Sequence, residues 1–201
     1  NISLSDSFFS PNGDGVKDTV VLTLAVPVTT GIERWSLALK GTTGQKGRTL
    51  TGSASIPPSI VFDGKDDQGA VLAEGSYVAR LEVLYVNGNN PSAESPALTV
   101  DVTAPSASAS TDLTIFSPDG DGNKDQITIF QETSEEVLWT GVFGDIDGRP
   151  VRSLSWRGRA DAQLEWGGRA DAGEQVPDGT YFYSLKATDR AGNTGESRRL
   201  R

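Results

Sequence analysis

Apolar and polar residues alternate along much of this chain, which is the pattern of half-buried β-strands. Apolar side chains take every second position over residues 20–26, 35–39 and 77–85. The same alternation returns, less regularly, over residues 127–129 and 181–187. No stretch has the spacing of an amphipathic helix, and glycine-containing turns separate the alternating stretches. We therefore predict an all-β fold.

A ten-residue segment occurs twice, 107 positions apart. It is Phe-Ser-Pro-Asn-Gly-Asp-Gly-Val-Lys-Asp at residues 9–18 and Phe-Ser-Pro-Asp-Gly-Asp-Gly-Asn-Lys-Asp at residues 116–125. Beyond this segment the two halves align with an offset of 104, which places Trp35 over Trp139. A period of about 100 residues is the size of one small β-sandwich and exceeds the roughly 20–50 residues of a solenoid repeat. The chain is therefore expected to hold two copies of one domain.

The two copies are predicted to be tandem immunoglobulin-like (fibronectin III-like) antiparallel β-sandwiches. The run Asp-Val-Thr-Ala-Pro that ends at Pro105 indicates a last strand that passes into a short linker, which the proline stiffens. We place the two domains at residues 1–105 and 106–201.

Two aligned tyrosines, Tyr77 and Tyr181, each open an alternating strand directly after an acidic-Gly-Ser or acidic-Gly-Thr turn. A tyrosine corner, whose hydroxyl bonds to backbone a few residues upstream, has this position in such sandwiches. A plain core aromatic explains the position as well, and the sequence alone favours it. The partner of the hydroxyl group distinguishes the two interpretations.

In the repeated segment, three oxygen-bearing side chains are spaced two and then four residues apart. The glycines between them allow a tight turn. This arrangement suits a calcium ion, which binds roughly six to eight oxygens, so each loop would need further ligands from elsewhere. Val16 and Asn123 would contribute backbone carbonyls. The predicted metal ligands are Asn12, Asp14, Val16 and Asp18 in the first copy and Asp119, Asp121, Asn123 and Asp125 in the second.

These loops are not EF-hands, because Thr23 and Phe130 occupy the twelfth position, where an EF-hand has a bidentate glutamate. A metal-free alternative stays open, in which the aspartates cap backbone N–H groups as Asx turns. Three nearby carboxylates repel one another, however, unless a cation or Lys124 offsets them. Because the first loop has Asn12 in place of a third carboxylate, we expect the second loop to bind calcium more tightly.

Charge and composition argue against several functions. The formal net charge of -9 is unfavourable for nucleic-acid binding, which needs a basic surface. No apolar run reaches the ~18 residues of a membrane-spanning helix, so we predict no membrane insertion by this segment. The chain has no histidine and no cysteine, the residues that most often serve as general base and thiol nucleophile. We predict that it is not an enzyme.

The segment at residues 9–18 resembles a motif of bacterial immunoglobulin-like modules. Three later pieces of the sequence support this resemblance. They are Trp/Phe-x-Gly, Asp-Gly-x-Tyr and the closing Asp-Arg-Ala-Gly-Asn at residues 189–193. These modules are related to the Ig-like domain of the flagellar hook-capping protein and to the gliding-motility-associated C-terminal domains. The first copy lacks the Asp-x-Ala-Gly-Asn close and has a looser loop at residues 87–90. The resemblance implies tandem modules in large exported proteins, where they act as spacers, adhesion modules or sorting domains.

We therefore predict a non-catalytic spacer or adhesion segment of an exported bacterial protein, located in the periplasm, at the outer membrane or on the cell surface. Its expected partners are other domains of the same longer chain, since the sequence begins at Asn1 and ends near a last strand; another protein or a surface glycan is the alternative. Two alternative functions stay open, a carbohydrate-binding module and a sorting domain for secretion. Exposed indoles would favour the carbohydrate-binding module, with Trp156 the best candidate among Trp35, Trp139, Trp156 and Trp166.

Overall fold

The structure is a computed structural model that describes all 201 residues. It consists of sixteen β-strands and has no helix, which confirms the predicted all-β class. The chain divides into two compact units, residues 1–103 with 190–192, and residues 104–189 with 193–201. The main division follows Thr103, and the sequence placed it at 105. We call these the first and second units.

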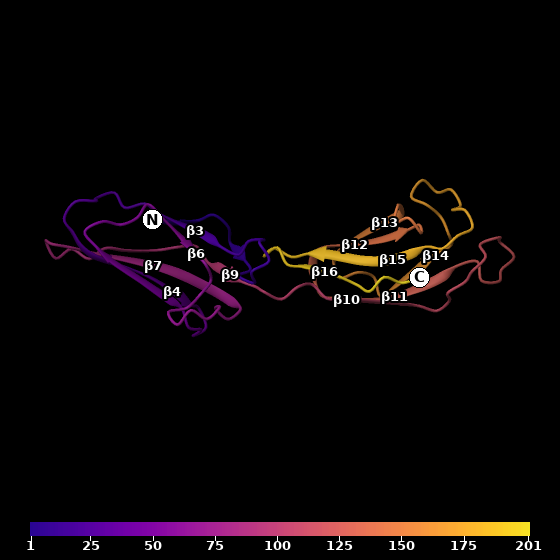
Figure 1. The fold of residues 1–201 in the computed structure, drawn as a ribbon, viewed down its shortest axis with the longest axis horizontal. Helices are drawn as coiled ribbons and strands as arrows, with labels where there is room; N and C mark the ends of the chain where they lie inside the picture. The colour runs from indigo at the N-terminus through magenta and orange to yellow at the C-terminus, as the bar shows by residue number, and fades with distance from the viewer. The chain divides into compact units, whose positions relative to one another are not determined.

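The first unit is a sandwich of two sheets (Figure 1). One sheet has the order β1-β3-β6, and the other has the order β2-β9-β7-β4-β5, with β8 also paired to β7. Neighbouring strands are antiparallel, except that β2 runs parallel to β9. The strands are β1 (Ile2–Leu4), β2 (Phe8–Phe9), β3 (Val20–Leu24), β4 (Ile32–Gly41), β5 (Arg48–Ser53), β6 (Ser59–Phe62), β7 (Gly75–Tyr85), β8 (Ser92–Glu94) and β9 (Leu98–Val100).

The second unit repeats this arrangement with the orders β10-β11-β14 and β13-β12-β15-β16. All of its strand pairs are antiparallel. Its strands are β10 (Ala107–Thr111), β11 (Ile127–Thr133), β12 (Glu136–Gly144), β13 (Pro150–Gly158), β14 (Gln163–Trp166), β15 (Phe182–Thr188) and β16 (Thr194–Glu196). Strands equivalent to β2 and β9 are absent. Both units are therefore immunoglobulin-like sandwiches, and the predicted fold class is confirmed.

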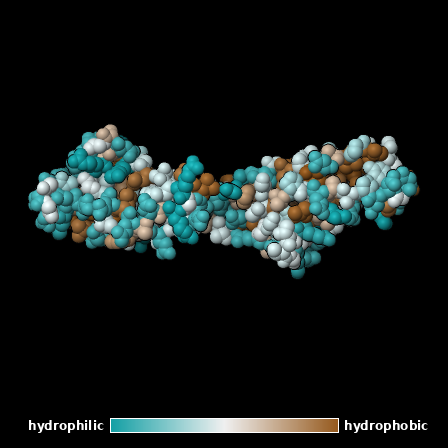
Figure 2. Space-filling view, turned by 180° about the vertical axis from the view of Figure 1, so that it is seen from behind, coloured by the Kyte–Doolittle hydropathy of each residue, from teal (hydrophilic) through white to brown (hydrophobic).

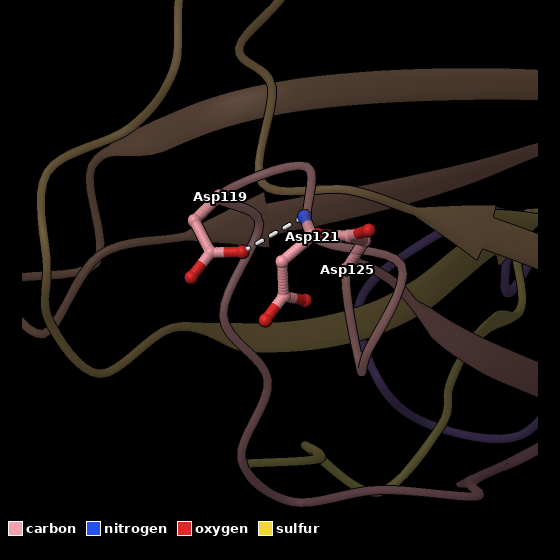
Figure 3. A group of neighbouring side chains, drawn as sticks. All are labelled: Asp119, Asp121 and Asp125. Carbon is pink, nitrogen blue, oxygen red and sulfur yellow. Dashed lines mark hydrogen bonds between the residues drawn. The ribbon is translucent and has the colours of Figure 1, made fainter.

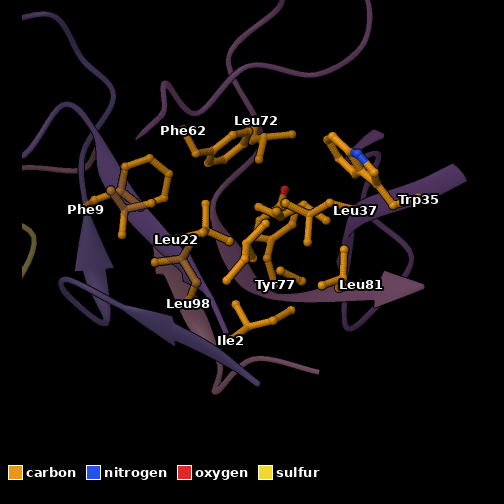
Figure 4. Packing of buried hydrophobic residues seen from close by; sticks show 14 of the residues in the cluster. Ile2, Phe9, Leu22, Trp35, Leu37, Phe62, Leu72, Tyr77, Leu81 and Leu98 are labelled. Atoms are coloured by element: carbon orange, nitrogen blue, oxygen red, sulfur yellow. The ribbon is translucent and has the colours of Figure 1, made fainter. Parts of the chain in front are cut away.

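The core of the first unit follows directly from the alternation in the sequence. Along β7 the side chains of Tyr77, Ala79, Leu81 and Val83 are buried, while the residues between them are more exposed. Figure 4 shows Tyr77 among core residues contributed by both sheets, including Leu22 and Leu98. Full burial of one such aliphatic side chain stabilises a fold by roughly 1.5–3 kcal/mol.

The core of the second unit is more aromatic. The ring of Phe143 stacks on Trp166, with centroids 4.2 Å apart, and lies 4.6 Å from the ring of Tyr183. Tyr183 also donates its hydroxyl hydrogen to Gln131 Oε1 at 2.7 Å. Burial raises the pKa of Tyr183, so this hydroxyl stays a donor at neutral pH. A buried polar pair thus accompanies the aromatic packing.

Both aligned tyrosines form tyrosine corners, which corrects the preference for a plain core aromatic. The hydroxyl group of Tyr77 donates to the carbonyl oxygen of Ala73 at 2.7 Å. That of Tyr181 donates to the carbonyl oxygen of Pro177 at 2.7 Å. In each case the acceptor lies four residues upstream, so the bond fixes the turn that leads into the strand. The sequence placed the rings correctly but could not show the acceptor.

We expect Tyr77→Phe to destabilise the first unit by about 0.5–1.5 kcal/mol, because it removes one hydrogen bond and keeps the ring. Tyr181→Phe should do the same to the second unit alone. Urea unfolding of the two single variants, followed for each unit, measures this. Unchanged midpoints in both variants would show that the hydroxyl bonds contribute nothing.

The surface drawn in Figure 2 is mostly hydrophilic, and strongly hydrophobic residues appear there as separate spots. The structure contains no helix long and apolar enough to span a membrane.

Candidate functional site

The candidate site is the repeated loop, which follows β2 in the first unit. Asp18 closes this loop by accepting two backbone hydrogen bonds, from Gly13 N at 2.6 Å and from Gly15 N at 2.7 Å. The two other predicted side-chain ligands form consecutive Asx turns: Asp14 N donates to Asn12 Oδ1 at 2.9 Å, and Val16 N donates to Asp14 Oδ1 at 2.7 Å. The side-chain oxygens thereby gather on the inside of one tight turn.

The loop of the second unit has the same network. Asp125 accepts from Gly120 N at 2.7 Å and from Gly122 N at 2.8 Å. Asp121 N donates to Asp119 Oδ1 at 3.1 Å, and Asn123 N donates to Asp121 Oδ1 at 2.7 Å. The repeated sequence therefore specifies a repeated local structure and not merely a shared composition.

Glycine is needed at the centre of each turn. In the second loop, Gly120 and Gly122 have φ angles of 83° and 88°, in the left-handed region that side chains rarely adopt. Lys124 shares this region with a φ of 57°. These angles turn the N–H groups of Gly120 and Gly122 toward the carboxylate of Asp125, which explains the Gly-Asp-Gly spacing.

The carboxylates of Asp119, Asp121 and Asp125 converge in the second loop (Figure 3). One oxygen from each lies within 4.8 Å of the others. Asp119 and Asp121 are exposed and Asp125 is partly buried. Lys124 forms no ion pair with these carboxylates. Two like charges about 4 Å apart repel by about 1 kcal/mol even in bulk water.

The first loop carries less uncompensated charge. The amide group of Asn12 donates from Nδ2 to Asp14 Oδ2 at 3.1 Å, a bond that an ionised Asp119 cannot make. Lys17 Nζ also lies 2.7 Å from Asp6 Oδ2, and this hydrogen bond lowers the pKa of Asp6. The second loop has neither feature, since Leu113 occupies the position equivalent to Asp6.

All eight predicted ligand residues thus lie in two well-defined turns, with Val16 and Asn123 serving there as N–H donors to aspartates. The hydrogen bonds match the Asx-turn alternative. A carboxylate oxygen that accepts one N–H keeps a further acceptor position, so the same oxygens still suit a cation. Calcium binding stays a prediction.

Three of the four tryptophans are buried and provide no surface platform for sugars. Trp35, Trp139 and Trp166 are buried, with relative exposures of 9%, 0% and 2%. Trp156 is partly buried and donates from Nε1 to Asp161 Oδ2 at 2.9 Å. A carbohydrate-binding module is expected to expose indole rings, and Trp35, Trp139 and Trp166 do not.

Fold and loops together define a pair of immunoglobulin-like sandwiches, each with one Asx-turn loop rich in oxygen-bearing side chains. No family model matches the chain, and no curated protein sequence matches it. The resemblance to hook-capping and gliding-motility modules thus has no support from a family match and stays a prediction.

Several solved structures resemble the chain at low similarity. The tetra-tandem repeat in the extending region of a large adhesion protein is 17% identical, with a TM-score of 0.38, over 100% of this chain and 48% of that chain. A structure of a 1.5-MDa bacterial ice-binding adhesin is 15% identical, with a TM-score of 0.47, over 100% of this chain and 62% of that chain. The fibronectin(III)-like modules of CbhA from Clostridium thermocellum are 12% identical, with a TM-score of 0.41, over 98% and 92%.

This chain spans about half the length of the first of these structures and under two thirds of the second. At these identities and TM-scores the likeness assigns no function to the chain.

Proposed function

We propose that this chain is a non-catalytic structural or adhesion segment of an exported bacterial protein of the cell envelope or surface. Its two sandwiches act as spacer modules, and calcium stabilises the repeated loops. The other domains of a longer chain are its partners. The carboxylate cluster of the second loop is the observation that carries the calcium part of this proposal.

The charge balance of the second loop supports a cation. Three carboxylates converge within 4.8 Å, on a turn whose lysine forms no ion pair. Their backbone hydrogen bonds hold the oxygens in place before any ion arrives, which lowers the entropic cost of binding. Hard oxygen ligands of this kind favour calcium over a transition metal.

The binding would be weak, as in extracellular calcium modules, with dissociation constants of about 10⁻⁴ to 10⁻³ M. At about tenfold excess over the dissociation constant, calcium stabilises the folded unit by roughly 1.4 kcal/mol. A domain of this size then melts roughly 5–10 °C higher. The ion thus makes a spacer more resistant to unfolding in a calcium-rich environment.

The substitution Asp119→Asn tests this proposal, because it gives the second loop the ligand set of the first. In chelator, we expect the variant to match or exceed the parent chain in stability, because the introduced amide removes one repelling charge and can donate as Asn12 does. In about 10 mM calcium, roughly tenfold above the weaker expected dissociation constant, the variant should instead melt at a lower temperature than the parent. Thermal unfolding of both chains in both conditions measures this reversal of order.

Asp147→Asn is the matched control, since Asp147 is an exposed aspartate of the same unit whose carboxylate pairs with Arg149 at 3.2 Å. Its calcium response should equal that of the parent. Identical calcium responses of parent, Asp119→Asn and Asp147→Asn would contradict calcium binding by the carboxylate cluster of the second loop.

A further inference from the structure

An open groove lies between the two sheets at one end of the second unit. Its volume is about 310 Å³, and its walls include Ile115, Phe116, Trp166, Tyr181 and Leu200. Ile127 and Ile129 of β11 and Phe143 of β12 also line it. Most of these side chains are apolar, so a folded sandwich would gain stability if the groove were filled.

The first unit has a strand in the equivalent place. There β9 pairs antiparallel with the start of β7, Leu98 opposite Tyr77 and Val100 opposite Gly75. It also pairs in parallel with β2, and Thr99 N donates to the carbonyl oxygen of Ser7 at 2.8 Å. Leu98 and Val100 are each only 1% exposed. The strand β9 therefore closes this end of the first core with two apolar side chains.

The register of the second unit shows where such a strand would begin. The pair Lys186–Glu196 matches Glu82–Ser92 of the first unit with the offset of 104 at both positions. Further along, Tyr183 pairs with Leu200, and each donates a backbone N–H to the other's carbonyl. Continuing this antiparallel register places the partner of Tyr181, and hence the counterpart of Leu98, directly after Arg201.

Two aromatic residues at the groove are partly exposed, whereas their counterparts in the first unit are buried. Tyr77 is 0% exposed, whereas Tyr181 is partly exposed. Phe9 is 0% exposed and lies in β2, whereas Phe116 is partly exposed and lies outside any strand. Its neighbour Ile115 is 80% exposed. All these differences lie along the place that β9 occupies in the first unit.

We propose that the groove is the seat of a closing strand, supplied by the same polypeptide directly after Arg201. The strand carries apolar side chains at its first and third residues. It pairs antiparallel with residues 179–181 and parallel with residues 115–116, as β9 does in the first unit. The pairing of Leu200 with Tyr183 already directs the chain toward the groove. This inference requires neither calcium binding nor the spacer role.

Grafting the closing strand of the first unit onto the second tests the proposal. The tetrapeptide Leu-Thr-Val-Asp, the sequence of residues 98–101, is added after Arg201 of the full chain. We expect the melting temperature of the second unit to rise by roughly 10 °C, because two apolar side chains become buried. Hydrogen exchange should slow at residues 115–116 and 179–182.

Two control extensions separate strand pairing from unspecific apolar contact. Ser-Thr-Ser-Asp lacks the apolar side chains and should leave the melting temperature unchanged. Leu-Pro-Val-Asp keeps them but lacks the central N–H, which in the first unit bonds to Ser7, and should lose most of the gain. The proposal is wrong if Leu-Thr-Val-Asp gives no gain, or if the proline version gives the same gain.

A free peptide of sequence Leu-Thr-Val-Asp, added at the protein concentration, distinguishes the sources of the strand. It should give no measurable stabilisation, because it lacks the effective concentration that a covalent link provides. A rise as large as that of the grafted chain would contradict supply from the same polypeptide and would indicate that the groove captures a segment of another molecule.

Discussion

Replacing Trp139 by alanine is expected to destabilise the second unit by about 3–5 kcal/mol, the usual cost of removing a large buried aromatic side chain. Trp139 is completely buried in β12, and its Nε1 donates to the carbonyl oxygen of Ser134 at 2.9 Å. Truncation leaves both a cavity and an acceptor without its donor. The free energy of unfolding of a small domain is only about 5–15 kcal/mol in total, so the second unit would lose much of its stability. Urea unfolding measures the change.

Trp156→Ala is the control for this variant. Trp156 lies opposite Trp139 across the β12–β13 pair, but it is partly exposed and donates to the side chain of Asp161. We expect Trp156→Ala to lower the free energy of unfolding of the second unit clearly less than Trp139→Ala does. Equal costs for the two variants would contradict the assignment of Trp139 to the centre of the core.

Leu98→Ala is expected to cost the first unit about 2–5 kcal/mol. Leu98 is 1% exposed and pairs with Tyr77, so its loss opens the end of the core that β9 closes. The second unit should unfold as before, since Leu98 belongs to the core of the first. Urea unfolding followed by backbone amide resonances of the first unit reports the loss.

Thr99→Ala provides the matched control on the same strand. Thr99 lies between two buried neighbours, is itself more exposed, and should cost less than about 0.5 kcal/mol, as surface substitutions usually do. If Leu98→Ala were as mild as Thr99→Ala, β9 would not close the core, and the comparison between the two units would lose its basis.

The fold could be predicted largely from the sequence, because most of the long sandwich strands alternate in polarity. The stretch from Tyr77 to Val83 alternates in burial just as it alternates in polarity. The spacing of the repeated loop independently indicates the length of one domain. The alternation is a local property of the sequence, and the fold class depends mainly on it.

Other features depend on partners far away in the sequence or on geometry that polarity does not encode. The tyrosine corners were underestimated because the acceptor carbonyls of Ala73 and Pro177 carry no sequence signal. The groove of the second unit could not be predicted, since it emerges only when the register of β15 and β16 is compared with that of β7 and β8.

The turn structure of the candidate loops could be anticipated from the sequence, because Asx turns and their glycines are local, while metal binding by these residues stays a prediction. The sequence could not show that Asp18 and Asp125 each bind two glycine amides, nor that Lys124 stays without an ion pair while Lys17 meets Asp6. These contacts decide how much negative charge remains for a cation, and they make the two loops unequal.

A calcium titration of the full chain, followed by the backbone amide resonances of the loop glycines, tests the central claim most directly. We predict that the amides of Gly120 and Gly122 shift with a midpoint at or below about 1 mM calcium. Those of Gly13 and Gly15 should shift only at higher concentration. Loop amides that stay unchanged up to about 10 mM calcium, well above the expected range of dissociation constants, would contradict calcium binding at the repeated loops, provided that they remain as well dispersed as the rest of the chain.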